Sequence, residues 1–168
     1  MEEREMSEEA FKRVVKQRRK EKDMSFVLAV YRTYDEFLKK EIQDSGVKLA
    51  CGKGCCSCCY QLISCTEMEI SEVFRYINKI PRPRRRSLIK RLKKKAKEWQ
   101  NYYQGNEAAL EIDPFKPVRD WWGRPCPFLN EETGSCDIYS VRIIDCRTLS
   151  SLIPCTLEME TAIPCELH

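Results

Sequence analysis

Histidine and long apolar runs are what this 168-residue sequence has least of. Its single histidine, His168, is the last residue. A terminal side chain is usually solvated, so we expect neither a histidine metal site nor a histidine-based catalytic pair. No apolar run approaches the roughly 20 residues needed to cross a bilayer, so we expect no membrane association. The length suits one domain with a core of ordinary size.

The N-terminal segment is acidic, and its first nine residues include five glutamates. Such a start lacks the basic and apolar regions of a signal peptide, so we expect a cytoplasmic protein with reduced thiols. The eleven cysteines therefore favour metal binding over disulfides, redox sensing or simple burial. Cys55-Cys56 and Cys58-Cys59 are adjacent pairs, which rarely bridge because a disulfide would strain the intervening peptide.

Apolar residues recur at helical spacing in the first half of the chain. Residues 7–22 carry a thin apolar stripe among many charges, and residues 24–42 carry a thicker one, so both are predicted helices. Gly46 can adopt the left-handed conformation that ends a helix. Thr66 and Glu69 form a capping box, which predicts the start of a further helix.

Proline and a second apolar stripe define the helix that follows. Pro81 and Pro83 end one helix and begin another, which runs to Tyr103. Residues 105–125 are rich in proline and are predicted to be an irregular connector. The pattern predicts a mainly α protein, a small helical bundle with an irregular cysteine-rich metal-binding region. We expect a charged lead-in helix over residues 1–22 and a single metal-binding domain over residues 23–168.

The cysteine spacing indicates how a metal could be held. Thiolate sites need several sulfurs around one zinc or around one iron–sulfur cluster. Cys51 and Cys55 are separated by three residues, and Cys55 and Cys58 by two, so this loop can present three or four sulfurs to one point. The remaining ligands must come from a distance, and the obvious candidates are Cys126, Cys136 and Cys146.

Four motifs carry a resemblance to a known family: Cys51-x3-Cys55-x2-Cys58-Cys59, Cys126-Pro-Phe-Leu129, Cys136-Asp-Ile-Tyr139 and Val141-Arg-Ile-Ile-Asp-Cys146-Arg147. In this order they resemble the small cysteine-cluster proteins of the YkgJ type, which contain a zinc- or iron-chelating CxxCxxCC domain. The resemblance spans roughly residues 50–150. It implies a chelating domain with seven cysteine ligands: Cys51, Cys55, Cys58, Cys59, Cys126, Cys136 and Cys146.

The chain departs from the family pattern just before Cys146. Such proteins commonly have Arg-Pro where this chain has Arg142-Ile143, so a differently shaped turn is expected there. Four cysteines outside the pattern are interpreted as ordinary thiols, although their being ligands stays open: Cys56, Cys65, Cys155 and Cys165. Lys53, Arg142 and Arg147 are placed in sequence to offset the negative charge of a thiolate site.

The metal and its use are open at this point. Thiolates suit zinc and iron–sulfur clusters alike. A cluster, of the 4Fe-4S type, is preferred because one compact loop closed by distant cysteines is typical of a cluster cradle. The spacing of Cys51, Cys55 and Cys58 also occurs in radical S-adenosylmethionine enzymes. Their barrel needs an alternating strand–helix pattern, which this sequence lacks.

Three functions are compatible with these residues. A non-enzymatic metal protein for electron transfer, metal delivery or assembly is favoured, because the sequence has no convincing acid–base pair, nucleophile–histidine pair or phosphate loop. A cluster-dependent enzyme is the second, to which a similarity to cysteine-rich flagellin lysine methylases points. A zinc-stabilised adaptor is the third, since ten of the sixteen residues 82–97 are Lys or Arg and could bind a protein or nucleic acid. Nucleic acid is not favoured at a net charge of +4.

Overall fold

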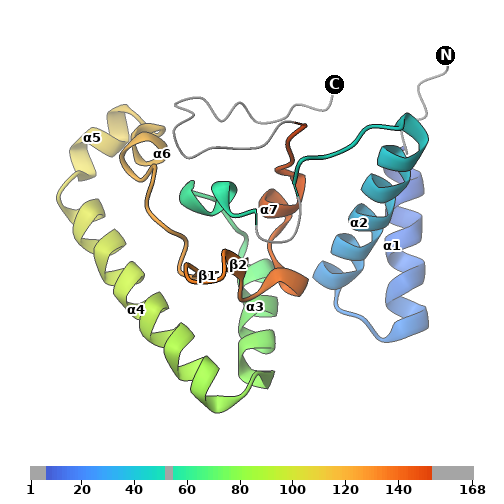
Figure 1. Ribbon diagram of the computed structural model, residues 1–168, viewed down its shortest axis with the longest axis horizontal. Helices are drawn as coiled ribbons and strands as arrows, with labels where there is room; N and C mark the ends of the chain where they lie inside the picture. Colours follow the sequence, from blue (N-terminus) through green and yellow to red (C-terminus); the bar gives the residue numbers. More distant parts are fainter. Residues whose placement is uncertain (1–6, 52–54, 153–168) are drawn as a thin grey trace.

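The computed structural model describes residues 7–51 and 55–152 and confirms the mainly α fold. Helices α1 (Glu8–Lys22) and α2 (Phe26–Ser45) form an antiparallel hairpin on one side of the molecule (Figure 1). Ser7 and Ser25 cap the two helices by accepting hydrogen bonds from backbone N–H groups of their first turns. Gly46 ends α2 at φ 69°, as predicted.

Helices α3 (Glu67–Lys79) and α4 (Arg82–Gln104) diverge from a shared corner like the arms of a V (Figure 1). The predicted capping box is present: Thr66 accepts from the backbone N–H of Glu69, and the Glu69 carboxylate accepts from the backbone N–H of Thr66. Pro83 stands in the first turn of α4, where its missing N–H is harmless. The two arms leave space between them for the cysteine-bearing segments.

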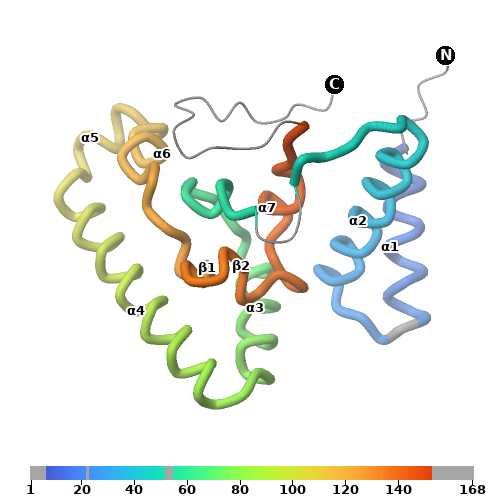
Figure 2. The backbone as a smooth tube through the Cα atoms, in the orientation of Figure 1, coloured from blue at the N-terminus to red at the C-terminus, as the bar shows by residue number. Residues whose placement is uncertain are grey.

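The remaining elements are short and lie between or beyond the arms of the V (Figure 2). The predicted connector contains two short helices, α5 (Glu107–Ile112) and α6 (Lys116–Asp120), rather than irregular chain. The other short elements are the 3-10 helices η1 (Ser57–Tyr60) and η2 (Tyr139–Val141), the paired strands β1 (Leu129–Asn130) and β2 (Ser135–Cys136), and helix α7 (Ile144–Thr148).

The hydrophobic core sits at the corner of the V, beneath the β1–β2 hairpin. Val73 and Ile77 of α3 meet Leu88 of α4, and Ile138 and Val141 close the cluster from the segment after β2. Apolar burial at this corner therefore fixes the hairpin and η2 against both arms. Within residues 7–51 and 55–152, no helix is both long and apolar enough to cross a membrane.

Candidate metal centre

Cys58 and Cys59 lie in η1, which is fastened to the chain just before Cys126. The backbone N–H of Cys126 donates to the carbonyl oxygen of Cys59, with an N···O distance of 2.7 Å. The N–H of Gly123 donates to the carbonyl of Tyr60 at 2.9 Å. Two segments more than sixty residues apart in the chain are thus joined at the cysteines themselves.

The β1–β2 hairpin brings Cys136 to the same region. Leu129 pairs with Cys136 in antiparallel register, and the N–H of Leu129 donates to the carbonyl of Cys126 at 3.0 Å. Gly134 provides the positive φ of 63° that this tight turn requires. Cys126 and Cys136 therefore occupy the two sides of one small, hydrogen-bonded unit.

Cys146 is carried by α7, a short helix that begins close to the first turn of α3. The hydroxyl of Ser64 donates to the carboxylate of Asp145 at 2.9 Å, which ties α7 to the segment that follows η1. Ile143 precedes α7 at φ −63°, the value that a proline ring would impose. Ile143 thus has a φ value compatible with the proline of the family pattern, and the expectation of a differently shaped turn stays a prediction.

The thiols of these three segments lie close enough to alter one another's ionisation. Burial raises the pKa of Cys126 to about 11 and that of Cys146 to about 12, and the neighbouring thiols add to both shifts. Burial also raises the pKa of Cys136. The hydrogen bond from Cys59 lowers the pKa of Cys58 to about 6, with help from Arg142, and correspondingly raises that of Cys59. The five thiols form one electrostatic group, the thiol cluster, made of Cys58, Cys59, Cys126, Cys136 and Cys146.

The other two cysteines of the predicted set lie on either side of residues 52–54. Cys51 is half-buried, and its sulfur accepts a hydrogen bond from the N–H of Ser151 at 3.0 Å. Cys55 is exposed. Among the residues that the structure describes, none of the nine cysteines forms a disulfide, and no three His, Cys, Asp or Glu side chains converge as ligands of one metal ion. The thiols of the cluster are thus close enough to influence one another's pKa, but they do not form a metal-coordinating arrangement.

The cysteines and charged residues outside the predicted set have varied positions. Cys56 is half-buried next to η1, and Cys65 is exposed just before α3. Lys53 lies outside the described residues, as do the C-terminal residues of interest, Cys155, Cys165 and His168.

Two arginines flank the thiol cluster, and they have different roles. The positive charge of Arg142 counteracts the raised pKa values of Cys136 and Cys146, and its Nε is buried without a hydrogen-bond partner among the described residues. Arg147 is 5% exposed, forms an ion pair with Asp35, and donates to the carbonyl oxygens of Arg142 and Ser140 at 2.8 and 3.0 Å. The charge of Arg142 therefore acts on the thiol cluster. Arg147 instead stabilises the backbone of residues 140–142 through its hydrogen bonds.

Glu69 also positions the site, and sequence reasoning gave it only a capping role. Its carboxylate accepts hydrogen bonds from the Tyr31 hydroxyl and from the N–H of Ile144, both at 2.8 Å. Burial opposes its ionisation, but the backbone donors of Ile144 and Thr66 outweigh that effect and hold its pKa below the usual value. Glu69 thus joins α2 and α3 to the start of α7. Its additional partners lie 38 and 75 residues away, so no local sequence signal reveals them.

A helical scaffold that collects free cysteines from separate segments is typical of thiolate metal-binding domains. Residues 50–162 match the CxxCxxCC family model, described as "Putative zinc- or iron-chelating domain". The chain belongs to this family. No curated protein and no solved structure matches the chain.

Proposed function

We propose that this protein binds zinc or iron through cysteine thiolates, and that an iron–sulfur cluster is the group it holds. The observation that supports this is the thiol cluster, in which five free cysteines from three separate segments influence one another's ionisation. Soft sulfur donors favour zinc and iron–sulfur clusters over harder cations such as magnesium. The proposed ligands are drawn from Cys51, Cys55, Cys58, Cys59, Cys126, Cys136 and Cys146.

The looseness of the thiol cluster fits a site that is completed by its metal. Without a metal, ionised thiolates brought together would repel one another and lose hydration. The thiols therefore stay protonated and apart. A bound metal would replace the thiol protons and draw the sulfurs inward. Cys51 and Cys55 flank residues 52–54, outside the described ranges, and their sulfurs would complete the set from the loop.

A role in electron transfer, metal delivery or assembly suits this site better than catalysis. The charged groups that act on the thiols of Cys58, Cys126, Cys136 and Cys146 are other thiols, Arg142 and, for Cys136, Asp137. Both carboxylate oxygens of Asp137 are already paired with arginines of α4. Arginine does not titrate near neutral pH and is a poor general acid or base. The side chains around the thiol cluster therefore provide charge compensation rather than proton transfer.

The test is the metal content of the protein purified without oxygen. We expect iron and acid-labile sulfide in matched amounts, with broad visible absorption. Colourless protein containing zinc would support the thiolate site but contradict the proposal of an iron–sulfur cluster. Protein that takes up neither metal after reconstitution would contradict the whole proposal.

The site itself is tested with a pair of serine variants. Cys126→Ser removes a half-buried thiol of the cluster and should abolish or strongly reduce metal retention. Cys56→Ser is the matched control, because Cys56 is also half-buried, neighbours η1 and lies outside the family pattern. Equal metal loss in both variants would contradict the ligand assignment.

A further inference from the structure

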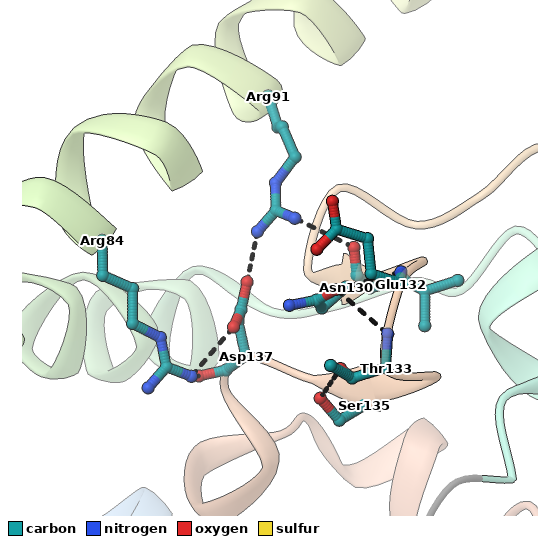
Figure 3. Close-up of polar contacts among 8 residues, drawn as sticks. Arg84, Arg91, Asn130, Glu132, Thr133, Ser135 and Asp137 are labelled. Carbon is teal, nitrogen blue, oxygen red and sulfur yellow. Dashed lines mark hydrogen bonds and ion pairs between the residues drawn. The ribbon is translucent and has the colours of Figure 1, made fainter.

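A recess lies between helix α4 and the β1–β2 hairpin. It has a volume of about 630 Å³, within the range of small-molecule sites. Figure 3 shows the polar side chains that gather there. The recess is lined by Arg84, Ser87, Arg91, Asn130, Thr133, Ser135 and Asp137.

Two arginines and one carboxylate set the charge of this recess. Asp137 is buried, and each of its oxygens is engaged by a different residue of α4: Arg84 at 2.8 Å and Arg91 on the other side (Figure 3). Arg91 also donates to the carbonyl of Leu129 at 3.1 Å. Two positive charges face one negative charge, so the lining carries a surplus of one positive charge. The side chain of Arg84 is 52% exposed, which leaves part of its guanidinium accessible.

The rest of the lining offers hydrogen-bond donors to an anion. The side-chain oxygen of Asn130 accepts from the N–H groups of Glu132 and Thr133, so the amide nitrogen of Asn130 is left to donate. The hydroxyls of Thr133 and Ser135 contact each other at 2.5 Å, and one hydrogen of this pair can point outward. Ser87 adds an exposed hydroxyl from α4.

Helix α4 adds a favourable field to these donors. Its first turn contains no acidic residue and its N-terminus has no side-chain cap, so the positive end of the helix dipole is not neutralised locally. The sixteen residues 82–97 contain ten Lys or Arg and no acid. Arginine, with its planar fork of donors, is well matched to the oxygens of a phosphate group.

We propose that this recess is a phosphate-binding site, formed by Arg84 and Ser87 of α4 with Asn130 and Ser135 of the hairpin. The ligand is a phosphate group, either on a small phosphoester or in an RNA backbone. The site is separate from the proposed metal ligands, although Asp137 directly follows Cys136. It does not depend on the metal being iron or zinc.

The test titrates inorganic phosphate into the full-length protein at constant ionic strength and follows backbone NMR shifts. Saturable shifts are expected at Ser87, Asn130 and Ser135. Ser87→Asp places a negative charge at the rim, three and four residues along α4 from Arg84 and Arg91, where it repels an anion and competes for both guanidinium groups. It should weaken phosphate binding about tenfold. Gln100→Glu adds the same charge to an exposed position on α4 outside the recess, and should change the affinity less than about twofold.

A variant that strengthens phosphate binding shows that the effects of the substitutions do not come from misfolding. Glu132 lies beside the recess (Figure 3), and its side chain is exposed. Its hydrogen bond to Asn130 is donated by the backbone N–H, which a side-chain substitution keeps. Glu132→Gln should therefore strengthen phosphate binding about twofold, whereas Glu111→Gln on α5 should leave it unchanged. Metal content, measured on the same samples, should be unaffected by all four substitutions.

The source of the phosphate is decided by repeating the titration with a nucleoside monophosphate and a single-stranded RNA. Tighter binding of the monophosphate supports a small phosphoester. Tighter binding of RNA that Ser87→Asp weakens more than Gln100→Glu supports a backbone phosphate. Equal weakening by Ser87→Asp and Gln100→Glu, or no saturable shift at the recess, overturns the proposal.

Discussion

Arg142 is the residue whose replacement tests the charge balance of the thiol cluster. Its charge lowers the pKa of Cys58 and counteracts the raised pKa values of Cys136 and Cys146. We expect Arg142→Gln to weaken metal affinity by roughly 10- to 100-fold, as removal of a supporting group around a metal site commonly does. Competition with a chromogenic chelator measures this change. Arg142→Lys keeps the charge and should retain most of the affinity, so an equal loss in both variants would rule out a charge effect.

The contrast between Arg142 and Arg147 shows what could be predicted from single residues. Both cations are recognisable from their positions beside Cys146. Which of them acts on the thiols depends on Asp35, which lies 112 residues before Arg147 and pairs with it. Such a long-range ion pair has no counterpart in local spacing. Sequence reasoning therefore identifies the charged residues but does not assign their partners.

At the level of helices, α3 is the element that connects the scaffold to the site. Glu69, in its first turn, joins Tyr31 of α2 to the N–H of Ile144 at the start of α7. We expect Glu69→Gln to lower the free energy of unfolding by about 2 kcal/mol at pH 7, because hydrogen bonds to a buried carboxylate contribute about 1.5–3 kcal/mol. Urea unfolding measures the change. Glu67→Gln, on the exposed side of the same turn, is the matched control.

The pH dependence of this contribution has a definite sign. The pKa of Glu69 is held below its reference value of 4.5 in the folded protein. Its stabilising contribution is therefore complete above pH 4.5 and is lost as the pH falls through the folded pKa. The difference between wild type and Glu69→Gln should shrink in acid. A difference that stays constant from pH 7 to pH 3 would show that ionisation of Glu69 is not responsible.

The helices differ in how far they could be predicted. The capping box of α3 and the prolines at the start of α4 are local signals, and both helices were predicted from them. Helices α5 and α6 are six and five residues long, too short for a periodic stripe. The three prolines at 114, 117 and 125 suggested a loop there. The V formed by α3 and α4 was not predictable either, because periodicity identifies an apolar face but not the element that covers it.

For the whole molecule, metal binding and folding should be coupled. The cysteine-bearing segments are joined to one another by single backbone hydrogen bonds, such as those from Cys126 to Cys59 and from Ala50 to Ser151. We expect removal of the metal by a chelator, without oxygen, to lower the melting temperature by about 10 °C. Thermal unfolding followed by circular dichroism measures this shift. Identical melting of the loaded and chelated protein would contradict the coupling.

Hydrogen exchange should show which segments lose protection when the metal is removed. Loss of metal should increase exchange in residues 55–60 and 123–151, where the cluster thiols lie. The α1–α2 hairpin, which is held by its own contacts such as the Arg18–Glu36 ion pair, should change little and acts as an internal control. The cysteine order in the sequence predicts that these segments are involved. Their exact approach depends on the core at the corner of the V and was not predictable.

The aromatic residues near the hairpin have an optical consequence. Trp121 is buried, with its ring centroid 5.0 Å from that of Trp99 and 5.2 Å from that of Tyr102. Two residues further on, Gly123 is bonded to Tyr60 at the end of η1. Trp122, by contrast, is 40% exposed. With Trp122 changed to Phe, intrinsic fluorescence would come from Trp99 and Trp121, and energy transfer to a coloured metal centre would quench it. The protein thus contains its own fluorescent reporter of loading, which would follow metal uptake in real time.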